Sequence, residues 1–416
     1  MQGDHFDTDS HATINQDWIA KARALTPILD VAGPRIDANK SLPIEILDAL
    51  FEAKMFRMLL PRSQGGAELD LPTFFQVMLA IAQGDASAAW SVAQSNGCAF
   101  SAAYMEPSAA REVFCSTRAV LAWGFPAGVC AITKVDGGWR ASGTWGFGSG
   151  SRHASWLGGH SQVCDGNGTA LKNSAGQAIE RTVLIPRESV TIVDDEWEVI
   201  GLRGTGSDTY AVKDLFVPDR FCIVARGVGR DQQHAADAAT GDEPERREQG
   251  PLYRFSPTIV YQSGFCAVAL GLARAMLDSF VILAQQKTPS GGGPLLRDNA
   301  LVQEHVAVSQ ARIASMTAWI MQSLRESWDR CVLTGRHSFD HRATMRLAST
   351  YAIREASKVV EQVYSDAGAT AIFKSQPFER RLRDMHAVAQ QVQANAAHLQ
   401  TAGQYYLGIK PNARFM

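Results

Sequence analysis

The stretch GTWGFGSGSRHASW, residues 143–156, places aromatic side chains, glycines and serines close together. Glycines let a flat ligand approach the backbone closely, and a serine hydroxyl can hydrogen-bond a ring nitrogen or carbonyl. The stretch lies within residues 118–226, where short β-rich runs alternate with turn glycines, as at Asp136-Gly137. This pattern predicts a compact, β-barrel-like central domain. Taken alone, a stretch rich in serine and glycine is more often an ordinary turn.

The regions on either side of this β domain have helical patterns. Residues 1–117 predict an N-terminal helical domain, in which Asn15 caps a first helix and Pro72 opens a long apolar one. Residues 227–251 are polar and lack periodicity, which is typical of a connecting loop. Residues 252–416 predict an antiparallel four-helix bundle, with helices near 256–285, 297–333, 340–370 and 380–405. The fold class is therefore α+β and multidomain.

Composition excludes several classes of protein. The 416 residues carry 40 Lys+Arg against 42 Asp+Glu, and this lack of a basic excess argues against nucleic-acid binding. The seven cysteines are scattered without CxxC spacing, so a reducing cytoplasm is expected. The first twenty residues are polar and acidic, and the apolar stretch 258–272 contains Gln262, so neither a signal peptide nor a membrane span is expected.

Common catalytic and nucleotide-binding motifs are absent. The chain has no GxGxxG after a strand, no GxxxxGK[ST], no HExxH and no GxSxG. His337 and His341 are four residues apart, but the charged residues around them indicate a solvated helix start, so no metal site is expected.

The layout resembles the acyl-CoA dehydrogenase fold, and within it the branch of flavin-dependent monooxygenases that act as oxygenase components of two-component aromatic hydroxylases. The resemblance covers nearly the whole chain. It is carried by residues 60–90, 143–156, 201–220, 251–280 and 380–391, which read LPRSQGGAELDLPTFFQVMLAIAQGDASAAW, GTWGFGSGSRHASW, GLRGTGSDTYAVKDLFVPDR, PLYRFSPTIVYQSGFCAVALGLARAMLDSF and RRLRDMHAVAQQ.

The resemblance implies a flavin site. The family places an aromatic-x-hydroxyl pair against the flavin, with the hydroxyl at the N5 edge. Here that pair is Phe147 and Ser149, separated by Gly148. The preceding strand of the family contacts the flavin ring, and its counterparts here are Trp123, Gly124 and Phe125, which could equally belong to the core of the β domain.

Two departures from the family shape the expected chemistry. The stretch MHAVAQQVQANAA after Asp384 has no carboxylate to act as the base of a dehydrogenase. The histidine that activates phenols in the branch corresponds to Gln391, and a second family histidine falls near Cys98. An electron-rich indole or amine needs no such activation. Gln391 could orient a substrate or bridge helices, and His386 could be an acid/base or a structural residue.

The resemblance also implies the cofactor and the partners. Gln303 matches the glutamine that binds the ADP half of FAD in dehydrogenases, but the arginine expected eleven residues earlier is Gly292, which favours reduced FMN over FAD. Arg297 could substitute for that arginine.

The expected enzyme takes reduced flavin from a separate NAD(P)H-dependent reductase and transfers one O2 atom through a flavin C4a-hydroperoxide. A homotetramer is expected. An acyl-CoA dehydrogenase or flavin oxidase, and a non-catalytic ligand-binding protein, are the alternatives.

Overall fold

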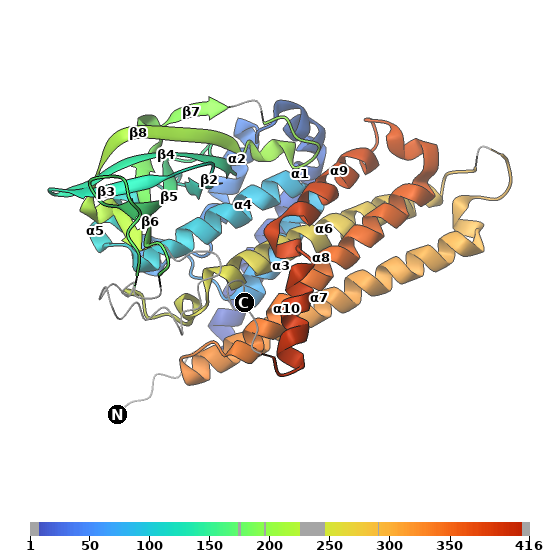
Figure 1. The fold of residues 1–416 in the computed structure, drawn as a ribbon. Coiled ribbons are helices and arrows are strands. Elements are labelled where there is room, and N and C mark those ends of the chain that lie inside the picture. Colours follow the sequence, from blue (N-terminus) through green and yellow to red (C-terminus); the bar gives the residue numbers. More distant parts are fainter. Residues whose placement is uncertain (1–7, 174–175, 195–196, 225–245, 290, 410–416) are drawn as a thin grey trace.

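A computed structural model describes residues 8–173, 176–194, 197–224, 246–289 and 291–409. Helices form the first and last parts of the chain, and a single sheet lies between them in sequence. Figure 1 shows the sheet on one side of the molecule, with α4 running between it and the long C-terminal helices. Most of the predicted connecting loop, residues 227–245, lies outside the described residues.

The N-terminal part contains five described helices, and one predicted helix is divided. Their bounds are α1 Thr8–Asn39, α2 Ile44–Glu52, α3 Leu71–Gly84, α4 Ala86–Ala99 and α5 Pro107–Val113. The predicted long helix from Pro72 is wrong, because Asp85 takes an extended conformation and its side chain caps α4 by accepting from Ala88 N–H. The predicted cap at Asn15 is also wrong, since this residue lies inside α1 and donates to Asp70.

The sheet is open and not barrel-like as predicted. Its strands are β1 Leu121–Trp123, β2 Phe125–Pro126, β3 Ala131–Val135, β4 Gly138–Gly148, β5 Trp156–Cys164, β6 Glu180–Pro186, β7 Thr191–Asp194, β8 Asp208–Pro218 and β9 Cys222–Val224. The order is β7-β8-β4-β3-β5-β6-β9, with β1 beside β5 and β2 beside β4. The two ends, β7 and β9, do not pair with each other. A helix packed on the sheet, α4 against β1, buries apolar surface without closure.

The C-terminal part is built around one central helix. The described helices are α6 Pro257–Ala284, α7 Ala300–Thr334, α8 Phe339–Ala367, α9 Phe378–Gln390 and α10 Ala397–Tyr406. The predicted single helix over 380–405 is wrong, because Gln391 has an extended backbone and a short 3-10 turn, Val392–Ala394, separates α9 from α10. The end of α9 and the turn after it line a cavity together with residues of the sheet.

Helix α6 is apolar on nearly all sides, which is typical of a helix buried in a protein core. It packs against α3, α4 and α8, and most of its residues are buried. Among the described helices it alone has the length and composition of a membrane span, but this core packing accounts for its apolar surface.

Candidate active site

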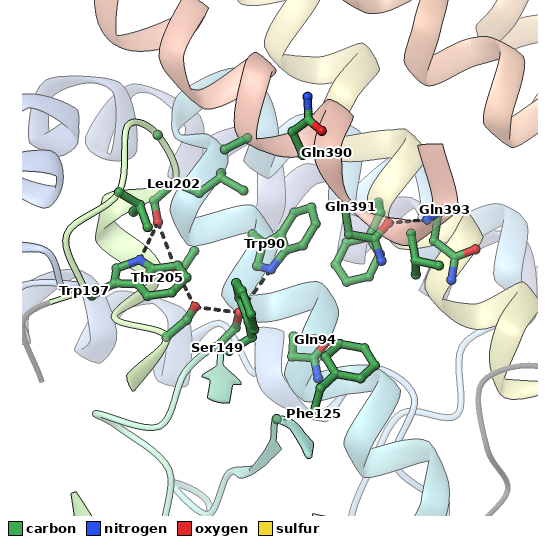
Figure 2. A pocket seen from close by; sticks show the side chains of 18 of the residues that line it. Trp90, Gln94, Phe125, Ser149, Trp197, Leu202, Thr205, Gln390, Gln391 and Gln393 are labelled. Carbon is green, nitrogen blue, oxygen red and sulfur yellow. Dashed lines mark hydrogen bonds between the residues drawn. The ribbon is translucent and has the colours of Figure 1, made fainter. Parts of the chain in front are cut away.

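A cavity of about 690 Å³ lies where the sheet, α4, the segment before β8 and the end of α9 meet. This volume suits a ligand of cofactor or drug size. The residues that line it are mostly aromatic or amide-bearing: Trp90, Gln94, Trp123, Gly124, Phe125, Phe147, Ser149, His160, Trp197, Glu198, Val199, Ile200, Gly201, Leu202, Thr205, Ser207, Tyr261, Phe265, His386, Ala387, Gln390, Gln391, Val392 and Gln393. Figure 2 shows several of these side chains around the cavity.

A bulge at the end of β4 sets the orientation of the key side chains. The pairing of β4 with β8 shifts between Trp145 and Gly148, and Phe147 adopts a left-handed φ of 58°. Such bulges redirect side chains and are common beside active sites. Phe147 is thereby 65% exposed at the cavity, whereas Ser149 is only 7% exposed. The predicted cofactor contact of Gly148 is wrong: this residue does not line the cavity but packs against Tyr210 and the backbone of Asp208.

Ser149 belongs to a buried hydrogen-bond network. The indole Nε1–H of Trp90 donates to Ser149 Oγ at 3.2 Å, and Ser149 Oγ lies 2.7 Å from Ser207 Oγ. Ser207 Oγ lies 2.7 Å from Thr205 Oγ1, which donates to the carbonyl of Leu202 at 2.8 Å. Figure 2 shows Trp90 directed at Ser149, and Trp197 directed at the Leu202 carbonyl. Ser149 is therefore held by its surroundings and is not a free turn residue.

Aromatic rings form flat walls around this hydroxyl. Trp90 stacks on Phe265 with ring centroids 4.0 Å apart, and Tyr261 extends the stack. On the other side, Phe147 and Trp197 meet edge to face at 5.8 Å. Such walls suit a planar, polycyclic ligand.

Most predicted cofactor-binding residues are brought together here. Trp123, Gly124, Phe125, Phe147 and Ser149 all line the cavity. Gln303 does not. It lines a second cavity of about 490 Å³ together with Arg274 and Arg297, and donates to the Arg297 carbonyl.

The predicted residues of α9 reach the same cavity. His386 is half-buried and lines the cavity from α9. Gln391 lies just past the helix, and its Oε1 accepts from the backbone N–H of Gln393 at 2.7 Å. Figure 2 shows this bond. This bond uses the amide oxygen of Gln391 and not its nitrogen.

Sequence reasoning missed Trp90, Trp197, Thr205 and Ser207. Trp90 ends the DASAAW stretch, and Thr205 and Ser207 lie in the GTGSD turn. Both stretches contribute to the resemblance, but their sequences alone do not indicate a role at the site. Their convergence on Ser149 depends on the pairing of β4 with β8 and on the packing of α4, which adjacent sequence does not reveal.

A buried cluster of charged residues, Asp85, Arg380 and Asp384, lies next to the cavity wall. The guanidinium of Arg380 bonds Asp85 at 2.8 Å and lies 3.8 Å from Asp384. Because one cation serves two buried carboxylates, burial outweighs its effect and raises the pKa of Asp384 to about 7. Asp384 accepts from the backbone N–H of Leu202 at 2.7 Å, which ties α9 to the cavity wall.

The lining itself carries little charge. Neither lysine nor arginine occurs among the described residues that line the cavity. Glu198 is the one carboxylate in the described part of the lining; it is 60% exposed and pairs with Lys40. Burial lowers the pKa of His160 to about 4, so that imidazole is neutral at pH 7.

The residues present fit a flavin. The volume, the flat aromatic walls and one buried hydroxyl with a remaining acceptor site match an isoalloxazine ring, which has flat faces and a polar N5 edge. Bound there, a reduced flavin would supply the electrons that activate O2. Ser149 would hold its polar edge, and the aromatic walls would exclude water.

Comparisons with known proteins show which proteins this chain resembles. Residues 263–396 match the family model described as "Acyl-CoA dehydrogenase, C-terminal domain". The chain is 27% identical to an indole-3-acetate monooxygenase of Pseudomonas putida, over 94% of this chain and 95% of that protein. It is 26% identical to the oxygenase subunit HsaA, a flavin-dependent monooxygenase of Rhodococcus jostii, over 88% and 91% of the two chains.

Solved structures show the same fold. XiaF from a Streptomyces species, solved with FADH2 and glycerol, superposes with a TM-score of 0.85 at 20% identity, over 97% of this chain and 98% of that chain. The chain therefore has an acyl-CoA dehydrogenase-like fold and is similar over most of its length to flavin-dependent monooxygenases that serve as oxygenase components.

Proposed function

We propose that this oxygenase component uses reduced FMN to insert one atom of O2 into a small, uncharged aromatic or nitrogen-containing molecule such as an indole. The observation that carries the substrate class is the lining of the cavity, which is aromatic and amide-rich and, over the residues that the structure describes, includes neither lysine nor arginine. A negatively charged substrate held among these residues would lose its hydration without gaining a cationic partner, and for the same reason the phosphate of FMN would extend beyond them.

Two amides offer complementary contacts to a substrate N–H or carbonyl. Gln94 uses its Nε2 toward the Trp123 carbonyl at 3.4 Å, so its Oε1 is left to accept from a ligand. Gln391 uses its Oε1 toward Gln393, so its Nε2 is left to donate. One acceptor on α4 and one donor just after α9 favour a neutral heteroaromatic compound over a carboxylate.

Reduced flavin is the cofactor of this branch, and FMN is proposed as the form used. FMN needs no second cationic site for a diphosphate, and Gly292 replaces the arginine expected there. One observation favours FAD as the second candidate, since Arg274 and Arg297 flank Gln303 around the separate cavity. Titration with reduced FMN and reduced FAD, compared in Arg297→Ala, distinguishes them, because only FAD binding should weaken.

The assembly and the location are further parts of the proposal. The reduced flavin comes from a separate reductase, and the NAD(P)H dependence of that enzyme is part of the proposal.

A homotetramer is proposed because α7 carries exposed apolar side chains, Leu301, Val308, Val332 and Leu333. Light scattering at micromolar concentration should give four times the mass of the chain; a monomer would contradict this. The seven cysteines are free thiols, which supports a cytoplasmic location.

The substrate class is tested with a matched pair of compounds. The protein is mixed with chemically reduced FMN, 18O2 and either indole or indole-3-acetate, and the products are analysed by mass spectrometry. One 18O atom in a product of indole, with at least about tenfold less product from the carboxylate, supports the proposal. Preference for the carboxylate would overturn the uncharged substrate class.

A further inference from the structure

A continuous row of buried hydroxyls leads away from the cavity behind Ser149. Oγ of Ser149, Oγ of Ser207 and Oγ1 of Thr205 follow one another at 2.7 Å. The row ends at the carbonyl of Leu202, 2.8 Å from Thr205 Oγ1. The three side chains belong to residues that are 7%, 2% and 3% exposed, so water cannot easily replace a missing bond.

Both ends of this row fix the direction of its hydrogens. A carbonyl only accepts, so the Thr205 hydroxyl donates to Leu202. Ser207 must then donate to Thr205, and Ser149 must donate to Ser207. At the other end, the Trp90 indole N–H only donates, and it fills one acceptor site of Ser149. The hydrogen of Ser149 is therefore directed away from the cavity, and one acceptor site remains.

The terminal carbonyl is itself firmly held. Leu202 adopts a left-handed φ of 53°, which a residue with a Cβ atom rarely takes without compensating contacts. Its N–H donates to Asp384 at 2.7 Å, and its carbonyl also accepts from Trp197 Nε1 at 3.3 Å. These bonds keep the acceptor at the end of the row in place.

We propose that Thr205 and Ser207 are positioning residues that make Ser149 a hydrogen-bond acceptor, so that the cavity binds reduced flavin in preference to oxidised flavin. This inference rests on the proposed function. Reduced flavin carries a hydrogen on N5 and can donate it to Ser149. Oxidised flavin has only a lone pair at N5, so Ser149 could satisfy it only by withdrawing its hydrogen from Ser207. An oxygenase component that receives reduced flavin and must release the oxidised form needs this difference.

The test measures the dissociation constants of oxidised FMN and, anaerobically, of reduced FMN. Thr205→Val removes the hydroxyl with little change in shape, and Thr205→Ser retains it as the matched control. Ser207→Ala is a second route to the same break in the row. The ratio of oxidised to reduced dissociation constants should fall about tenfold in Thr205→Val and Ser207→Ala. This change corresponds to about 1.4 kcal/mol, or about 30 mV in the potential of the bound flavin. Thr205→Ser should stay within about twofold of the parent protein.

The outcomes separate this inference from the proposed function. An unchanged ratio in both Thr205→Val and Ser207→Ala, with FMN still bound, would overturn the inference alone. A fall in Thr205→Ser equal to that in Thr205→Val would also overturn it, because the methyl group and not the hydroxyl would then matter. A parent protein that binds neither form of FMN or FAD would overturn the flavin site and the inference together.

Discussion

Ser149→Ala removes the hydroxyl that we place at the polar edge of the flavin. The residue is 7% exposed, and its Oγ accepts from Trp90 at 3.2 Å and bonds Ser207 at 2.7 Å. A neutral hydrogen bond to the flavin is worth about 0.5–1.5 kcal/mol net, so reduced FMN should bind about 2–12-fold more weakly. The orphaned Trp90 N–H should lower the free energy of unfolding by about 1–3 kcal/mol.

The larger effect is expected on the fate of oxygen. Without the hydroxyl, the reacting edge of the flavin loses a fixed partner, and the release of hydrogen peroxide should accelerate at least about tenfold, or about 1.4 kcal/mol on that barrier. Stopped-flow reoxidation of bound reduced FMN, with hydrogen peroxide assayed in parallel, measures it. Ser161→Ala is the control, because Ser161 is equally buried but bonds Gly159 in β5, outside the cavity lining. Unchanged peroxide release in Ser149→Ala would refute the placement of the flavin edge.

Three further predictions concern the surroundings of this hydroxyl. Burial raises the pKa of Asp384 to about 7, so the folded chain holds the carboxyl proton more tightly than the unfolded chain does. The contribution of this proton to the free energy of unfolding is complete below about pH 4 and is lost as the pH rises through 7. Urea unfolding between pH 4 and 8 should therefore show a flatter decline in Asp384→Asn, and parallel curves would contradict the assignment. Trp90→Phe should keep the stack on Phe265 but lose the N–H, costing about 0.5–1.5 kcal/mol in thermal unfolding; a loss above about 3 kcal/mol would mean that the ring itself is displaced. His386→Ala should lower product formation while leaving the affinity for reduced FMN within about twofold; equal loss of both would mark the residue as structural.

The helical ends and the central sheet could be predicted from periodicity, but the closure of the sheet could not. Strand-like runs show which segments form strands, but they do not show whether the two edge strands of the sheet pair with each other to close a barrel. Here β7 and β9 are the edge strands of the sheet, and α4 covers apolar surface of the sheet that would otherwise be buried inside a closed barrel. The domain boundaries at 117, 226 and 251 stay predictions.

The helix breaks at Asp85 and Gln391 were missed for local reasons. Both lie in sequence that reads as continuous helix, and each break depends on a side-chain cap: Asp85 to Ala88 N–H, and Gln391 to Gln393 N–H. An aspartate after Gly84 is a recognisable start signal, so the first break was readable in principle. The second was not, because glutamine is an ordinary helix residue.

The site residues that lie within one continuous segment were predicted, whereas those that reach the site from distant segments of the chain were missed. The strand end at residues 147–149 has a composition that suggests a ligand. By contrast, Thr205 and Ser207 reach Ser149 only because β8 pairs with β4 across a bulge, and Trp90 reaches it only through the packing of α4. Contacts of this kind depend on tertiary structure and have no signature in a single sequence.

The most direct test of the flavin site is a crystal structure of the protein grown anaerobically with reduced FMN. We predict density for the flavin ring in the cavity between Trp90, Phe147 and Trp197, with N5 within hydrogen-bond distance of Ser149 Oγ. A flavin bound outside this cavity, or bound inside it with N5 turned away from Ser149, would contradict the account.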